Sequence, residues 1–146
     1  MIYEVRTYTL RPGTVAEFEE RFAARLSLRE QHSKLGAFWH TEFGPLNQVI
    51  HVWPYENTLE RSKIRAEAIK RGIWPPKTSE FIAEMKSEIF EPRPYSPPLA
   101  PSSQGPYFEM RTYVLKPGGQ WPPQTGVRPI RQENKLLIPA AFSPVR

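Results

Sequence analysis

The chain has 146 residues, which is enough for one hydrophobic core and too few for two domains of ordinary size. It contains no cysteine, which excludes disulfides, thiolate metal sites and cysteine nucleophiles. The net charge is +5, but three of these positive charges fall in residues 120–146, and basic and acidic residues are interleaved elsewhere. Because nucleic-acid-binding proteins gather lysine and arginine on one face, we expect no nucleic-acid partner.

Sequence motifs narrow the function classes further. The chain contains no dinucleotide-binding GxGxxG, no phosphate-binding GxxxxGK[ST], no GxSxG and no HExxH, so we expect no cofactor. It also lacks aspartate, so an acid–base pair has to use glutamate with histidine or tyrosine. No stretch is long and apolar enough to span a membrane, and the chain starts without a leader-like segment, so we expect a cytoplasmic protein.

The first predicted elements are a strand and a helix. Residues 2–10 alternate between apolar and polar side chains and are rich in β-branched and aromatic residues, which predicts a strand. The spacing of Thr14 and Glu17 predicts a capping box, and apolar residues then recur at helical intervals up to Gly36.

A hairpin and a second helix follow. We predict strands over residues 37–43 and 48–53, joined by a tight turn at Gly44–Asn47. Asn57 has Glu60 three residues later, which predicts an N-cap for a helix that ends near Gly72.

A short helical segment and a last strand complete the pattern. They are predicted over residues 79–84 and 85–91. The order β-α-β-β-α-β predicts an α+β fold of the ferredoxin-like type, in which a four-stranded antiparallel sheet carries both helices on one face.

Proline marks the end of this unit. Residues 92–146 hold 12 of the 17 prolines, and each proline fixes φ and removes a hydrogen-bond donor. We therefore predict a domain over residues 1–98 and a proline-rich linker over 99–106.

The segment after the linker repeats the start of the chain. Residues 108–118 match residues 3–13 at seven of eleven positions, which predicts an extra strand over 107–118. The likeness stops after Gly118, and residues 119–146 show neither strand nor helix periodicity, so we expect an irregular or disordered tail. The tail is either the remainder of a truncated or altered second copy or a proline-rich binding arm.

Several segments of the chain resemble the NIPSNAP family. They are the opening Ile2–Gly13, the hairpin segments Glu42–Asn47 and Val49–Trp53 with Tyr55, the helical residues Arg61, Arg65 and Trp74, and Pro92–Pro97. The resemblance covers residues 1 to about 98, and the repeated strand is similar to the tandem arrangement of that family. It implies the dimeric α/β-barrel fold, in which two sheets pack through their helix-free faces, and hence a homodimer.

Strand alternation selects the candidate site. On the first strand, Glu4, Arg6 and Tyr8 share one face, and we assign that face to the side of the sheet without helices. Residues from the second and third strands extend the group on the same side. The predicted pocket therefore contains Glu4, Arg6, Tyr8, His40, Glu42, His51 and Trp53.

Each of these residues also has a structural interpretation. Glu4 and Arg6 are suited to a cross-strand ion pair, His51 to a hydrogen-bonded sheet histidine, and Trp53 to packing. Two histidines and Glu42 would form a metal site only if the strands brought them together, and their spacing does not support it, so we expect no metal.

Two functions remain open. The first is a homodimeric module that binds a small molecule or a partner protein. The second is a cofactor-independent monooxygenase or isomerase, in which a histidine acts as base, a glutamate orients it and Arg6 holds an anionic substrate.

Overall fold

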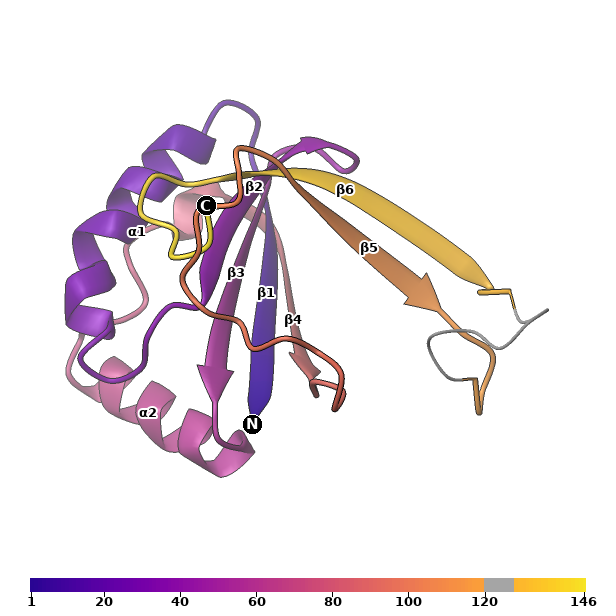
Figure 1. Ribbon diagram of the computed structural model, residues 1–146. Coiled ribbons are helices and arrows are strands. Elements are labelled where there is room, and N and C mark those ends of the chain that lie inside the picture. Colours follow the sequence, from indigo (N-terminus) through magenta and orange to yellow (C-terminus); the bar gives the residue numbers. More distant parts are fainter. Residues whose placement is uncertain (120–127) are drawn as a thin grey trace.

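The computed structural model describes residues 1–119 and 128–146. Two helices cover one face of a six-stranded antiparallel sheet with the order β4-β1-β3-β2-β6-β5 (Figure 1). The elements are β1 Ile2–Leu10, α1 Val15–Arg29, β2 Ala37–Phe43, β3 Gln48–Tyr55, α2 Thr58–Lys70, the 3-10 turn η1 Ser79–Phe81, β4 Ile82–Phe90, β5 Phe108–Val114 and β6 Arg131–Pro139. In the described part of the chain, no helix has the length and apolar character needed to cross a membrane.

The first four strands form the predicted ferredoxin-like sheet. β1 lies in the middle and pairs with both β3 and β4, so that Val5 is opposite Val52 on one side and Glu88 on the other. The turn at residues 44–47 joins β2 to β3, and Gly44 (φ +99°) and Asn47 (φ +57°) both adopt the left-handed conformation that such a turn requires. The fold class read from the sequence is confirmed.

An aromatic core lies between the sheet and the helices. Phe18 and Phe22 of α1 are fully buried, and the Phe22 ring contacts Phe38 and Trp53 of the sheet with centroids 4.7 and 6.3 Å apart. Large aromatic side chains bury the most apolar area per residue, so this layer supplies much of the free energy that holds the helices to the sheet.

The two helices begin differently. Asn57 caps α2 as predicted, because its side-chain oxygen accepts a hydrogen bond from the Glu60 amide at 2.9 Å. The capping box predicted for α1 is wrong: the Thr14 hydroxyl donates instead to the Arg11 carbonyl at 2.7 Å, and Glu17 pairs with Arg21.

This difference gives a first test. Asn57→Ala removes a side-chain cap and is expected to lower the free energy of unfolding by about 1 kcal/mol. Thr14→Ala removes no bond to the helix amides and is the matched control, for which we expect a smaller loss. Urea denaturation monitored by circular dichroism measures both values. Equal losses for the two variants would contradict the assignment of the caps.

The last strand of the domain starts earlier than predicted. Only residues 79–81 form a helical turn, and β4 covers 82–90 in place of 85–91. Leu10 is opposite Ile82, and the Arg11 amide donates to the Phe81 carbonyl at 2.8 Å. Pairing with the end of β1 therefore holds residues 82–84 in an extended conformation.

The irregular tail predicted for residues 119–146 is wrong for residues 131–139, which form β6. This strand pairs with β2 on one side and β5 on the other. Its first half, Arg131–Lys135, is polar on both faces, so it lacks the alternation by which strands are recognised in a sequence. Residues 120–127 lie outside the described residues.

The face of the sheet without helices carries a second apolar cluster, which we call the open-face cluster. Trp39, Ile50 and Val52 form its base. Residues that follow the domain cover them: Leu137 and Val145 are buried here, and Leu99, Phe108 and Met110 pack against the cluster. The β5–β6 hairpin then projects away from the other strands (Figure 1). The chain thus shelters part of its own open face.

Candidate functional site

Glu4, Arg6 and Tyr8 lie on the helix-covered face, so the predicted assignment of the two faces of β1 is wrong. Tyr8 contacts Phe18 of α1, and Glu4 contacts Arg61 of α2. The alternate residues of β1, among them Val5, pack against the open-face cluster. The prediction placed the more polar set on the helix-free side, whereas arginines from α2 compensate the charge of Glu4 on the helix-covered side.

Glu4 is the centre of a buried charge cluster. Its side chain is fully buried, and Oε1 accepts hydrogen bonds from Arg61 at 2.6 Å, Arg6 at 2.8 Å and Ser87 at 2.8 Å. The Arg65 guanidinium lies 3.9 Å from Oε2. Burial acts to raise the pKa of Glu4, but these donors outweigh it and lower the pKa to about 2. Three guanidinium groups thus surround one carboxylate, which leaves two positive charges unbalanced within the cluster.

Arg6 links this cluster to Tyr8. Its Nε donates a hydrogen bond to the Tyr8 hydroxyl oxygen at 2.6 Å, while Nη1 donates to Glu4. The guanidinium is therefore fixed at both ends, and its position does not depend on solvent.

His51 and Trp53 lie deeper, in the aromatic core. The Trp53 indole nitrogen donates to Nδ1 of His51 at 2.7 Å, so Nδ1 is an acceptor and the proton of the neutral ring is on Nε2. Burial, together with the positive charge of Arg6, lowers the pKa of His51 to about 3. His51 is accordingly neutral at physiological pH and bonded within the core.

His40 and Glu42 stand apart from this group. Nδ1 of His40 bonds Glu19 of α1 at 2.7 Å, and this hydrogen bond raises the pKa of His40. Glu42 is exposed. Among residues 1–119 and 128–146, no three His, Cys, Asp or Glu side chains come close enough together to hold a metal ion.

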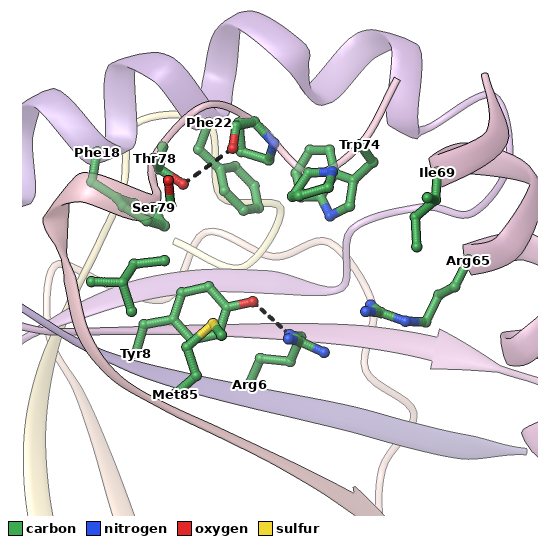
Figure 2. A pocket seen from close by; sticks show the side chains of 13 residues that line it. Arg6, Tyr8, Phe18, Phe22, Arg65, Ile69, Trp74, Thr78, Ser79 and Met85 are labelled. Carbon is green, nitrogen blue, oxygen red and sulfur yellow. Dashed lines mark hydrogen bonds between the residues drawn. The ribbon is translucent and has the colours of Figure 1, made fainter. Parts of the chain in front are cut away.

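A cavity of about 270 Å³ lies between the sheet and the helices. Figure 2 shows Arg6, Tyr8 and Met85 on the sheet side, Phe22 and Trp74 facing them, and Arg65 with Ile69 at one end. Most of the wall is apolar, and its charged groups are Arg6 and Arg65. The remaining lining residues are Phe18, Pro75, Pro76, Thr78, Ser79 and Ile82.

Only Arg6 and Tyr8 of the seven predicted residues line this cavity. Arg65 was not among the predicted site residues, although Arg61 and Arg65 are four residues apart and therefore share one face of α2. Trp74 was also missed, because it lies in a loop where no periodicity relates it to the sheet.

Arg29 adds a further positive charge behind the aromatic wall. Its side chain is buried, and its nitrogens donate to the Tyr55 hydroxyl at 2.9 Å and to Ser33 at 2.6 Å. The guanidinium carbon lies 4.6 Å from the centre of the Trp53 ring, a cation–π distance. Burial lowers the pKa of Arg29.

Fold and site together define a ferredoxin-like α+β domain of the dimeric α/β-barrel type, extended by two strands and with a cationic, largely apolar cavity beneath its helices. The sequence model of the NIPSNAP family matches residues 3–97. The chain belongs to the NIPSNAP family.

Similar proteins agree with this assignment. The chain is 35% identical over 124 residues to human Protein NipSnap homolog 3A, covering 82% of this chain and 50% of that protein, and 35% identical over 122 residues to mouse Protein NipSnap homolog 3B, covering 80% and 49%. It thus spans about half the length of the curated relatives it matches.

Solved structures show the same fold. An uncharacterized NIPSNAP-like domain protein from Burkholderia xenovorans is 32% identical, with a TM-score of 0.59, over 70% of this chain and 94% of that one. A NIPSNAP family protein with unknown function from Agrobacterium tumefaciens is 26% identical, with a TM-score of 0.63, over 66% of this chain and 92% of that one.

Proposed function

We propose that this chain is a binding module for a small, largely apolar anion of the carboxylate class, held in the cavity between the sheet and the helices. The observation that carries the proposal is the excess of arginine at one end of an apolar cavity. Arg6 and Arg65 both line the space, and the single carboxylate of Glu4 balances only one of the three guanidinium groups around it.

The dimensions and walls of the cavity favour the same class of ligand. Pockets that bind small molecules are concave and mostly apolar, with a few polar groups that fix the orientation. Here Phe22, Trp74 and Met85 offer contacts to a hydrocarbon or aromatic body, and Arg65 is suited to a carboxylate because its planar fork donates two parallel hydrogen bonds. Of the two lining arginines, Arg65 is held less tightly by its neighbours. It is 3.9 Å from Glu4, whereas Arg6 is hydrogen-bonded to both Glu4 and Tyr8.

A matched pair of probes tests the proposal. Octanoate and octanol share an alkyl chain and differ in charge, so isothermal titration calorimetry on the full chain is expected to give clearly tighter binding for octanoate. A hydrogen-bonded charge contributes about 1.5–3 kcal/mol, so Arg65→Met is expected to weaken octanoate binding about ten- to hundredfold. Arg71→Met is the control, because Arg71 directly follows the same helix, pairs with Glu67 at the surface and does not line the cavity.

Two results would count against the proposal. One is equal affinity for octanoate and octanol, which would make the arginines irrelevant to the ligand. The other is an equal loss of octanoate binding in Arg65→Met and Arg71→Met, which would point to a general charge effect.

The oxygenase or isomerase alternative stays a hypothesis with less support. Its base was to be His51 or His40, and neither lines the cavity. His51 contacts the rings of Tyr8 and Phe22, which stand between it and the space. A general base needs hydrogen-bond reach to its substrate, so we favour binding over catalysis.

The homodimer also stays a prediction. It was expected on the helix-free face, and there the trailing residues of the chain cover much of the open-face cluster. The proposed module therefore holds its ligand within one chain, and a dimer has to involve the strands that occupy that face.

A further inference from the structure

The register of β1 and β4 gives the long axis of the cavity. Three pairs of opposite residues follow one another along these strands: Arg6 with Ser87, Tyr8 with Met85 and Leu10 with Ile82. Arg6 and Ile82 both line the cavity, with Tyr8 and Met85 between them. Leu10 follows Arg6 by four residues, and strand residues are about 3.3 Å apart, so this wall extends about 13 Å from Arg6 to Ile82.

Both charged lining groups lie at the Arg6 end of this axis. Figure 2 shows the guanidinium groups of Arg6 and Arg65 pointing toward each other, with Ile69 beside Arg65. Nε and Nη1 of Arg6 donate to Tyr8 and Glu4. Within the described residues, Nη2 of Arg6 and the guanidinium of Arg65 donate no hydrogen bond. These donors are therefore available to a carboxylate placed between the two arginines.

The two ends of the cavity also differ in their contact with solvent. Beside the arginines, the side chain of Arg65 is 26% exposed and Ile69 is 57% exposed. Figure 2 shows Phe18 and Thr78 at the end away from Arg65, and both are buried. A carboxylate at the arginine end keeps part of its hydration and gains charged donors. Beside Phe18 the same ionised group would lose its water without gaining a cation, which is costly.

We infer that the ligand binds in one orientation, with its carboxylate between Arg6 and Arg65 and its hydrocarbon body along β1 toward Ile82. This inference rests on the proposed function and narrows the ligand class. A second carboxylate is accommodated next to the first, where the positive charges outnumber Glu4. It is excluded from the far end, because Arg6 and Arg65 are the only cations among the described residues that line the cavity. The module therefore binds acids with all their charge at one end and discriminates against acids with a carboxylate at each end.

Two isomeric dicarboxylates test the orientation. Pentylmalonate carries both carboxylates at one end of its alkyl chain and suberate carries one at each end, so the two ligands share composition and charge. Isothermal titration calorimetry on the full chain is expected to show about hundredfold tighter binding of pentylmalonate, because suberate places an unpaired charge beside Phe18. Equal affinities, or tighter binding of suberate, would overturn the inference.

Octanoate and octanol, measured in the same way, separate this inference from the proposed function. If octanoate binds no more tightly than octanol, the proposed function fails and the orientation fails with it. If octanoate is preferred and Arg65→Met removes the preference, the proposed function stands. Suberate binding as tightly as pentylmalonate would then show that the orientation alone is wrong.

A lysine at the far end is expected to reduce the discrimination. Ser79 lines the cavity beside Thr78 and is exposed, so the surface can accommodate Ser79→Lys. The new ammonium group can pair with the far carboxylate of suberate, so we expect suberate to bind about tenfold more tightly and pentylmalonate to change little. Ile69→Lys is the control, because it adds the same charge at the arginine end.

The two lysine variants give opposite expectations for suberate and pentylmalonate. Ile69→Lys should leave the preference for pentylmalonate at least as large as in the natural chain. An equal gain in suberate affinity in both variants would mean that net charge, rather than its position, governs binding. That result, or no gain in a Ser79→Lys chain with native circular dichroism, would contradict the orientation.

Discussion

Glu4→Gln is expected to destabilise the fold by about 3–5 kcal/mol, because it leaves three partly buried arginines without the buried carboxylate they surround. The substitution keeps the shape of the side chain and removes only its charge. Glu4 accepts hydrogen bonds from Arg61, Arg6 and Ser87, so all three donors lose their strongest acceptor. Urea denaturation at neutral pH measures the effect.

An ion pair of the same two residue types supplies the control, because Arg111 of β5 donates to Glu109 at 2.6 Å. Glu109→Gln makes the same chemical change beside Arg111, but this pair is exposed, and exposed ion pairs contribute little to stability. We expect no measurable loss from it. If both glutamine variants lose the same stability, burial is not what makes Glu4 important.

Stability is expected to fall as the pH drops below 6.5, mainly because of His51. The ordinary pKa of histidine is 6.5, and that of His51 in the fold is about 3. Between these values the unfolded chain binds a proton that the folded chain excludes, so acid favours unfolding. One such group lowers the free energy of unfolding by about 1.4 kcal/mol for each pH unit.

His51→Gln isolates this contribution, because an amide oxygen can accept the hydrogen bond from Trp53. The variant should lose stability less steeply from pH 6.5 down to about 4, measured by urea denaturation at several pH values. The pKa of His40 is raised, so His40 contributes stability that is present below 6.5 and lost at higher pH, the opposite direction. Equal slopes for the variant and the natural chain would mean that another group controls the acid response.

The sequence predicted the fold well because its signals are local. Alternation over Ile2–Leu10, the amide cap at Asn57 and the turn after Phe43 each depend on a few neighbouring residues, and the structure contains all three elements. The capping box at Thr14 failed because the hydroxyl is turned toward the Arg11 carbonyl, to which it donates, and accepts no hydrogen bond from the helix amides.

The site was harder to predict, since alternation says which residues share a face but not which face is covered. Glu4 and Arg6 are polar and were placed away from the helices, yet Glu4 is buried because Arg61 of α2, 57 positions later, donates a hydrogen bond to it. That contact depends on how α2 lies over the sheet. Arg65 and Trp74 were missed for the same reason.

β6 escaped prediction for a different reason. Its polar first half is held by hydrogen bonds to β5, and its apolar end by the edge of β2. Its conformation is therefore decided by residues that are distant in the sequence, such as Thr112 opposite Glu133. In the sequence, the repeat of β1 in β5 was the one feature indicating that this part of the chain contains a strand, which then needs another strand to pair with.

The buried guanidinium of Arg29 has a consequence for how the cavity meets a ligand. It lies 4.6 Å from the ring of Trp53 and 5.9 Å from that of Trp74, and the two indoles meet edge to face with centroids 5.8 Å apart. The side chain of Trp74, on the cavity wall, is thus held in place before a ligand binds. When a ligand binds, Trp74 therefore has little side-chain freedom left to lose, and the entropic cost of binding is lower. The contact with Arg29 that produces this effect is not itself a contact with the ligand.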